Sequence, residues 1–211
     1  MIFHDRTTAG RKLAQRLNHL KSKNVVVLGL PRGGVPVAFE VAREINAPLD
    51  VIVVRKLGVP FQSELAMGAV GEGGVVMKND EVIRMAKIST EQFVEAEARE
   101  RQEVVNRATK FREGRSPISL EGRLALIVDD GIATGSTAQA ACDVARALGA
   151  EKVILAVPVG SNEAVNALLK KADEVICLDI PDNFFAVGEW YEDFSPVSDE
   201  EVVQLLRKGH T

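Results

Sequence analysis

Hydrophobic runs that are long enough for single strands recur along the chain and alternate with helical patterns. The runs are mostly apolar and rich in Val and Ile, which is typical of strands covered on both faces in a parallel sheet. The alternation predicts an α/β fold: a single domain with a five-stranded parallel sheet flanked by helices and joined by right-handed crossovers. The predicted strands cover residues 25–30, 49–54, 124–128, 152–160 and 174–178, and the predicted helices cover residues 5–20, 35–45, 138–149 and 163–171.

The pattern changes between residues 57 and 115, where residues 58–64 and 71–74 are turn-rich and short strand patterns cover residues 66–70 and 75–77. We expect a small antiparallel insertion here, with a mobile loop that closes over a ligand. The core of the domain then comprises about residues 20–56 and 116–180.

Ser89 and Gln92 are spaced like a capping box and predict the start of a long charged helix that runs toward Phe111. The apolar positions of this helix are too sparse for a coiled coil. The helix either rests on the domain with a solvated outer face or forms a packed or dimer-forming arm.

The C-terminal part, about residues 181–211, holds the only Trp and Tyr of the chain and three of its eight Phe. Flat side chains gathered in one segment provide a stacking surface for a planar base, and a hydrophobic cap over the sheet would use the same residues. A closing helix pattern starts at Ser198 and runs through Leu206.

Composition and charge narrow the class of protein. The formal charge of −4 and the pI near 5.5 argue against a nucleic-acid or membrane partner and favour a small molecule. The two isolated cysteines, Cys142 and Cys177, make a disulfide framework or a zinc site improbable. Because there is no apolar stretch of about 18 residues and no signal-peptide pattern, we expect a soluble, cytoplasmic protein.

Residues 124–137 carry the strongest chemical signal. A buried-strand pattern ends in two adjacent carboxylates, Asp129 and Asp130, and a loop of small residues then leads into a helix. Backbone N–H groups of such a loop converge at a helix N-terminus and suit a phosphate group. The two acids would repel a bare phosphate, so they make sense if they face sugar hydroxyls or a Mg²⁺ ion that keeps its waters. A ribose 5-phosphate has both features, whereas the alternative is a solvated acidic turn before an ordinary helix.

Residues 128–137 resemble the phosphoribosyl pyrophosphate (PRPP) signature of type I phosphoribosyltransferases. The resemblance implies that Asp129 and Asp130 meet the ribose 2′- and 3′-hydroxyls and hold Mg²⁺ through water. One departure is Gly131, where the family more often has an aliphatic residue. The resemblance also implies that the 5-phosphate is held by Ala133, Thr134, Gly135, Ser136 and Thr137.

A second loop, at residues 31–34, follows the strand pattern of residues 25–30. Taken alone, Arg32-Gly33-Gly34 is a tight turn, but beside the first motif it resembles the pyrophosphate loop of the family. The resemblance implies that Arg32, Gly33 and Gly34 bind the diphosphate and that a non-proline cis peptide lies in this loop.

Arg55 and Lys56 are expected at the carboxyl end of the strand of residues 49–54, where ligands of open parallel sheets bind. Adenine and orotate phosphoribosyltransferases have a similar pair in contact with PRPP, which implies this role for Lys56 first and for Arg55 second. A solvated strand end is the alternative.

The C-terminal part is similar to the hood of hypoxanthine phosphoribosyltransferases, which frames the purine. An extra residue makes Phe184 and Phe185 compete for the stacking position, and we assign it to Phe185. Hypoxanthine-type members also carry an acid where this sequence has Ala133, so that general base is missing. Glu64 and Glu72 are the candidates to replace this base, and the alternative is that both are surface acids.

The resemblance implies a Mg²⁺-dependent enzyme of nucleotide salvage, expected as a homodimer, that transfers the phosphoribosyl group from PRPP to a nitrogenous base and releases diphosphate. A purine is the favoured acceptor, and Arg32, Lys56, Asp129 and Asp130 are the catalytic residues. One alternative is a PRPP-binding regulator or sensor with little or no turnover. Another is a catalyst that uses the same phosphate loop on a different phosphoribosyl or phosphate ester.

Overall fold

The computed structural model describes residues 1–209, and the side chains of Ser63 and Glu64 lie outside the described part. Five strands form a parallel sheet in the order β2-β1-β6-β7-β8, which confirms the predicted α/β fold. Because β2 and β6 lie on opposite sides of β1, the strand order reverses there, and ligands of such sheets bind at the carboxyl ends of the strands beside the reversal. The strands are β1 (Val25–Gly29), β2 (Leu49–Val51), β6 (Leu124–Val128), β7 (Lys152–Val159) and β8 (Glu174–Asp179).

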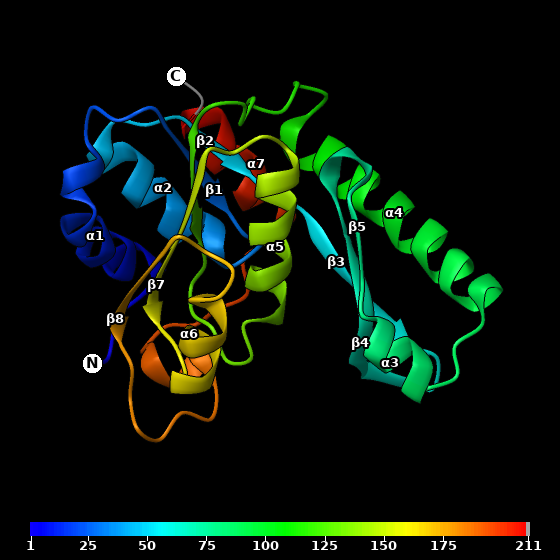
Figure 1. Cartoon of the computed structure of the whole chain (residues 1–211). Helices are drawn as coiled ribbons and strands as arrows, with labels where there is room; N and C mark the ends of the chain where they lie inside the picture. Colours follow the sequence, from blue (N-terminus) through cyan, green and yellow to red (C-terminus); the bar gives the residue numbers. More distant parts are fainter. Residues whose placement is uncertain (210–211) are drawn as a thin grey trace.

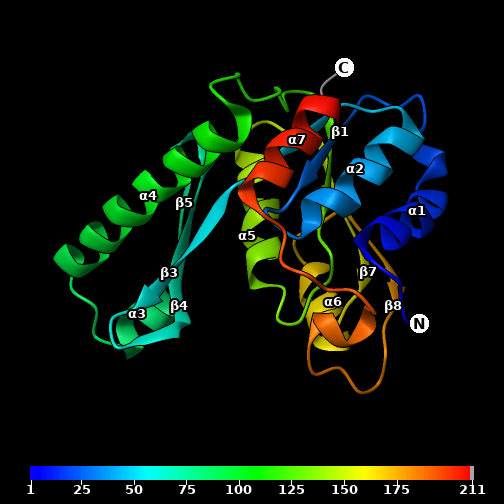
Figure 2. The same cartoon turned by 180° about the vertical axis from the view of Figure 1, so that it is seen from behind.

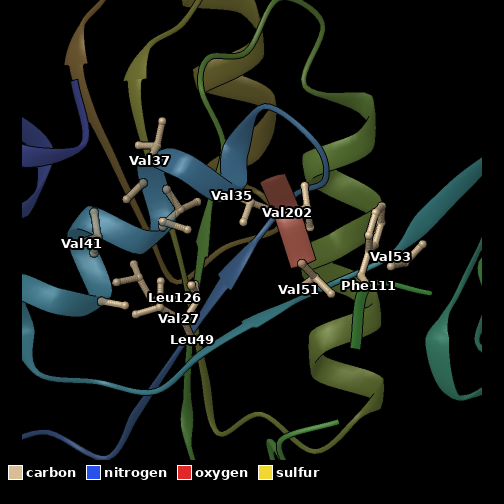
Figure 3. Close-up of a cluster of buried hydrophobic side chains, with 14 of the residues drawn as sticks. Val27, Val35, Val37, Val41, Leu49, Val51, Val53, Phe111, Leu126 and Val202 are labelled. Carbon is tan, nitrogen blue, oxygen red and sulfur yellow. The ribbon is translucent and has the colours of Figure 1, made fainter. Parts of the chain in front are cut away.

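Helices cover both faces of this sheet (Figures 1 and 2). Alternate strand residues face opposite sides, so Val27 and Leu126 pack against α1, α2 and α7, while Val26 and Ile127 pack against α5 and α6. Figure 3 shows part of the first of these two clusters. The helices are α1 (Arg6–Arg16), α2 (Gly34–Ile45), α5 (Ser136–Ala147), α6 (Asn162–Leu168) and α7 (Asp199–Gly209), and the short 3₁₀ turns are η1 (Asn18–Leu20), η2 (Glu72–Gly74) and η3 (Val187–Trp190).

Residues 54–112 form an arm that stands beside the sheet core (Figures 1 and 2). Its antiparallel sheet has the order β3-β4-β5, as predicted for an insertion of this kind. The arm also carries two helices that follow the sheet. The elements are β3 (Val54–Val59), β4 (Gln62–Gly71), β5 (Val76–Lys78), α3 (Asp80–Met85) and α4 (Thr90–Arg112).

Two details of the arm correct the sequence prediction. The sequence pattern predicts a turn at residues 58–64, but most of this segment belongs to β3 and β4. The register of the two strands shifts at Gly58, which accommodates that glycine within β3, and only Pro60 and Phe61 make the turn. The strand expected at residues 49–54 ends at Val51. Arg55 and Lys56 therefore lie within β3 of the arm and not at the carboxyl end of a core strand.

Helix α4 begins with the predicted capping box. The N–H of Gln92 donates to Ser89 Oγ at 3.2 Å, and the N–H of Ser89 donates to Gln92 Oε1 at 2.9 Å. One face of the helix buries Phe93 and Phe111 and packs on β3, β4 and α7, so the helix is part of a packed arm. Every helix within residues 1–209 is too short or too polar to span a bilayer.

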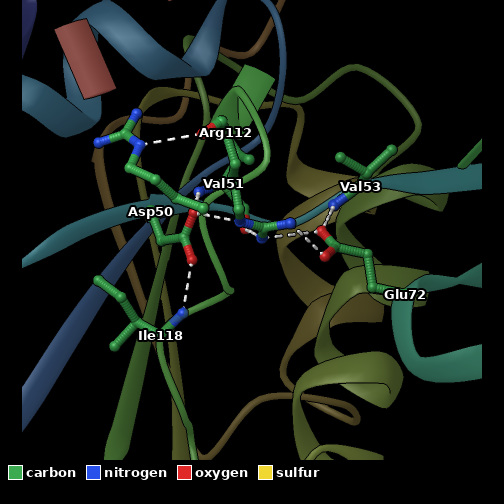
Figure 4. Close-up of polar contacts among 7 residues, drawn as sticks. Asp50, Val51, Val53, Glu72, Arg112 and Ile118 are labelled. Carbon is green, nitrogen blue, oxygen red and sulfur yellow. Dashed lines mark hydrogen bonds and ion pairs between the residues drawn. The ribbon is translucent and has the colours of Figure 1, made fainter. Parts of the chain in front are cut away.

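A buried arginine joins the arm to the core (Figure 4). Arg112 Nε donates to Asp50 Oδ1 at 2.8 Å, its Nη1 donates to Glu72 Oε2 at 2.6 Å, and its Nη2 donates to the Val51 carbonyl at 2.9 Å. The N–H of Ile118 donates to the second oxygen of Asp50 at 2.9 Å. Burial opposes the charge of Arg112, but the carboxylates of Glu72 and Asp50 raise its pKa above the usual value.

This network also corrects the assignment of Glu72. Its side chain is only 11% exposed, and its carboxylate accepts hydrogen bonds from Arg112 and from the N–H of Val53 at 2.8 Å. Glu72 is thus a structural ion-pair partner and neither a surface acid nor a free general base. The side chain of Glu64 lies outside the described residues.

We expect Arg112→Gln to lower the free energy of unfolding by about 3–5 kcal/mol, because the substitution leaves the carboxylates of Asp50 and Glu72 buried without their cation. Urea unfolding followed by circular dichroism measures this loss. Arg101→Gln is the matched control, since Arg101 pairs with Glu97 on the same helix but is 41% exposed, and it should cost less than about 1 kcal/mol. Equal losses in the two variants would contradict the role of Arg112.

Candidate active site

The loops that follow β1 and β6 lie side by side at the sheet edge. Gly29 pairs with Val128, and the N–H of Leu30 donates to the Val128 carbonyl at 2.9 Å. A Cβ atom on Gly33 would lie 2.1 Å from Asp130 Oδ2, and one on Gly34 would lie 2.6 Å from the Val128 carbonyl oxygen. Both glycines are therefore needed for the loops to touch, and the two predicted ligand loops form one surface.

Arg32 lies at the exposed side of the first loop. The peptide bond between Pro31 and Arg32 is cis, as the family resemblance implies. The side chain of Arg32 is 54% exposed, and its Nη1 lies 3.8 Å from Asp199 Oδ1 at the start of α7. The positive charge of Arg32 thus remains open to solvent near the start of α7.

The second loop leads into α5 with an open end. Gly135 occupies the N-cap position with φ +69°, so this position has no side chain that competes for the first N–H groups of the helix. Ala133, Thr134 and Thr137 are exposed. Ser161 Oγ donates to the Ala133 carbonyl at 2.6 Å and also accepts from the N–H of Ala164, so Ser161 caps α6 and braces the loop. The geometry suits an anion at the N-terminus of α5.

Asp129 and Asp130, which we call the acidic pair, are held in place mainly by Arg6. No sequence pattern had pointed to Arg6 as a residue of the site. Arg6 Nε donates to Asp130 Oδ2 at 2.8 Å, and the two side chains are only 12% and 13% exposed. The N–H of Asp130 donates to Asp129 Oδ1 at 2.9 Å, and Tyr191 Oη donates to the Asp130 carbonyl at 2.5 Å. Nothing in the helix pattern around Arg6 indicates this contact, because its partner is 124 positions away.

Burial disfavours the ionised form of both carboxylates of this pair. Burial, and next the charge of Asp130, raise the pKa of Asp129 well above its ordinary value. Burial also raises the pKa of Asp130, while Arg6 opposes this shift. A cation or hydroxyl donors placed against the pair would therefore favour its ionised form.

The hood aromatic residues mainly pack on one another. The rings of Phe184 and Trp190 stack with centroids 6.3 Å apart and an angle of 10°. Tyr191 lies against Phe3 with centroids 5.6 Å apart. These four residues therefore belong to the hydrophobic cap. Phe185 is 81% exposed and Phe194 is 36% exposed, so Phe185 is the aromatic side chain of the hood that is most open to a ligand.

The hood also accounts for Gly131, the position at which the loop departs from the family pattern. A Cβ atom there would lie 2.6 Å from Val187 Cγ1 and 3.0 Å from Val159 Cγ1. The hood side chain Val187 thus takes the space that an aliphatic residue at position 131 would need.

A cavity of about 740 Å³ opens between the two loops and the arm. Pro31 and Thr137 contribute from the core, and Arg55 and Lys56 contribute from β3. We call it the arm cavity. The structure therefore brings the predicted Arg55 and Lys56 to the ligand loops by way of the arm, although neither ends a core strand. The remaining lining residues are Val54, Gly58, Val59, Pro60, Phe61, Gln92, Glu95, Ala96, Arg99, Glu100 and Arg107.

Comparisons with known proteins agree with this geometry. The phosphoribosyl transferase domain model matches residues 4–193. A Mycobacterium tuberculosis protein, provisionally named a phosphoribosyl transferase, is 58% identical over 209 residues, which are 99% of this chain and 47% of that protein. The chain thus spans about half the length of the curated relatives it matches.

Two solved structures illustrate the likeness of the fold. A crystal structure of a Thermus thermophilus protein has 43% sequence identity, a TM-score of 0.89 and full coverage of both chains. A purine phosphoribosyltransferase from Pyrococcus horikoshii has 16% identity, a TM-score of 0.50 and 90% coverage of each chain, which shows the shared fold alone. With the family model matching nearly the whole chain, the protein belongs to the phosphoribosyl transferase family and has the type I fold.

Proposed function

We propose that the chain binds PRPP at the joined ends of β1 and β6 and transfers its phosphoribosyl group to a nitrogenous base, with release of diphosphate. The observation that carries this proposal is the juxtaposition of the acidic pair, the open N-terminus of α5 and the Arg32 loop on one surface. These are the parts that a sugar carrying a phosphate at one end and a diphosphate at the other requires.

In this proposal the 5-phosphate binds the N–H groups of the loop from Ala133 to Thr137. Three or four charge-assisted hydrogen bonds of about 1.5–3 kcal/mol each would supply most of the roughly 8 kcal/mol of a micromolar site. The ribose hydroxyls donate to Asp129 and to the oxygen of Asp130 that Arg6 leaves free.

The diphosphate binds at Arg32, at the amide of Gly33, and at Lys56 and Arg55. Gly34, whose N–H already donates to the Leu30 carbonyl at 3.0 Å, contributes by letting the loop backbone come close to the end of β6. The bond between ribose C1 and a diphosphate oxygen breaks with positive charge developing on the sugar, so cations around the leaving group and the carboxylates near the ribose both favour the transition state. Water must be kept from C1, because it would otherwise take the place of the base.

The residues present fit a Mg²⁺ ion that is shared with the substrate. Among the described side chains, no cluster of three or more His, Cys, Asp or Glu residues gathers to hold a metal unaided. The two carboxylates of Asp129 and Asp130, together with waters and substrate oxygens, form the hard oxygen set that Mg²⁺ uses in phosphate sites. When bound, the ion would neutralise charge on the departing diphosphate, while Asp129 and Asp130 orient its waters.

The acceptor in this proposal is a purine, on the strength of the hood resemblance and the exposure of Phe185. The cellular role that follows is nucleotide salvage in the cytoplasm, and the homodimer stays a prediction. The second candidate is a PRPP-binding regulator with little or no turnover. It is favoured by Ala133, which provides no general base in the phosphate loop.

We expect PRPP binding to weaken at least about tenfold, or about 1.4 kcal/mol, when Asp129→Asn and Asp130→Asn are combined, because the amides cannot hold the hydroxyls and Mg²⁺ as carboxylates do. Titration calorimetry with and without Mg²⁺ measures this, and the wild type should bind more tightly with the ion. Asp182→Asn, an exposed hood position, is the control. Unchanged affinity in the double variant would refute the site.

We also expect diphosphate release from PRPP with at least one member of a panel of purines, pyrimidines and small amines. A coupled assay for diphosphate measures it, with Asp129→Asn as the inactive reference. PRPP binding without release across the whole panel would instead support the regulator.

Phe185→Ala should weaken base binding at saturating PRPP by roughly threefold to tenfold, since an aromatic stacking contact contributes about 0.5–1.5 kcal/mol. Equilibrium dialysis with the acceptor found in the panel measures this. Phe185→Tyr keeps the flat ring and should retain the affinity. If Phe185→Ala binds the base as the wild type does, the stacking assignment is wrong.

A further inference from the structure

The arm cavity carries more positive than negative charge. Four of its lining residues are cations, Arg55, Lys56, Arg99 and Arg107, whereas only Glu95 and Glu100 are acids. Glu100 accepts from both Arg55 Nε at 2.9 Å and Arg99 Nε at 3.3 Å, so two arginines share one carboxylate. Among the side chains that the structure describes, Lys56 and Arg107 have no ion pair.

A second group of cations lies beside the Arg32 loop. Asp199 Oδ2 accepts from Lys110 Nζ at 2.6 Å, and Asp199 Oδ1 lies 3.8 Å from Arg32 Nη1. The hydrogen bond from Lys110, followed by the charges of Lys110, Arg32 and Arg107, lowers the pKa of Asp199. Arg32 and Lys110 thus share the carboxylate of Asp199. Arg107, whose charge also lowers the pKa of Asp199, lines the arm cavity.

Helix α4 is the element that places these cations together. Arg99 and Arg107 are eight residues apart, about two helical turns, and Lys110 is three residues further, so all three lie near one face of the helix. Cations that outnumber the acids beside them repel one another, and an anion bound between them relieves the repulsion. The anion would sit next to Pro31 and Thr137, which line the same cavity.

We propose that Arg99 and Arg107 of α4 bind the diphosphate of the activated sugar, so that the arm forms a second wall of the diphosphate site opposite the Arg32 loop. This inference rests on the proposed function and gives residues 57–115 a role in it. When the C1–O bond breaks, both electrons stay on the diphosphate oxygen. The acceptor nitrogen supplies the electron pair of the new bond and releases its proton to solvent.

The acceptor base is a less suitable occupant of the arm cavity. A nucleophile that displaces the diphosphate in line approaches C1 from the face opposite the leaving group. If Lys56 and the Arg32 loop hold the diphosphate, the base lies on the hood side of the ribose and away from α4.

The test compares three ligands on the folded chain of residues 1–211 by titration calorimetry: PRPP, inorganic diphosphate and ribose 5-phosphate, which lacks the diphosphate. Arg99→Gln and Arg107→Gln should each weaken PRPP and diphosphate binding about tenfold, and the double variant should weaken both further. Ribose 5-phosphate binding should stay unchanged. Arg84→Gln, an exposed position on α3 of the same arm, is the control and should leave all three affinities as in the wild type.

The outcomes separate this inference from the proposed function. If PRPP binds the wild type and the double arginine variant equally well, the inference is wrong and the proposed function stands. If ribose 5-phosphate binding weakens as much as PRPP binding, the arginines act through the overall positive potential of the site or through the stability of the fold, and the inference is also wrong. If PRPP does not bind the wild type, both are overturned. Arg107→Lys should recover part of the lost affinity, and equal melting temperatures confirm that the exposed substitutions leave the fold intact.

Discussion

Asp129 and Asp130, two adjacent carboxylates at the end of a buried strand, require compensating contacts from the segments packed around them. Their burial is unfavourable unless cations and hydrogen-bond donors compensate for it. Arg6 comes from the N-terminal helix, Tyr191 comes from the hood, and the glycines of the Arg32 loop let the backbone of that loop approach closely. Segments from both ends of the chain therefore meet at Asp130.

A second buried charge organises the other side of the molecule. Arg112 is the last residue of α4, and its guanidinium binds the carboxylates of Asp50 and Glu72 and the carbonyl that ends β2. A buried ion pair of this kind contributes less net stability than its short distances suggest, since both charges are desolvated. It does define the position of the arm, because α4 is attached to the core strand that lies next to β1. Arg99 and Arg107 of α4 consequently line the same cavity as Pro31 and Thr137 of the core.

The hood places neighbouring aromatic residues in different environments. Phe184, Trp190 and Tyr191 cover the sheet edge, and Val187 fills the space above Gly131. Phe185, which directly follows Phe184, is left exposed. Two adjacent aromatic residues with opposite environments are thus consistent with both alternatives of the sequence analysis: the cap uses one ring, and the proposed base stacking uses the other.

Local sequence was sufficient for the alternating strands and helices of the core, although not for the end of β2 or for the strands of the arm. Apolar runs such as residues 124–128 indicate buried strands on their own, and the alternation with helices leads to the five-stranded sheet. The spacing of Ser89 and Gln92 indicated the capping box, and the acidic pair was recognisable because it directly follows a strand. In each case the residues that carry the signal are neighbours in the chain, so their chemistry can be read without knowing the fold.

Only the tertiary structure decided which distant residues complete the site. Arg6 donates a hydrogen bond to Asp130, and Arg112 donates one to Glu72. Arg55 and Lys56 reach the ligand loops from β3 of the arm and not from a core strand. The reason is that an ion pair or a cavity depends on where two chain segments pack, and packing is a property of the whole core. Sequence patterns therefore determined what each segment is, whereas the fold determined what each charged side chain faces.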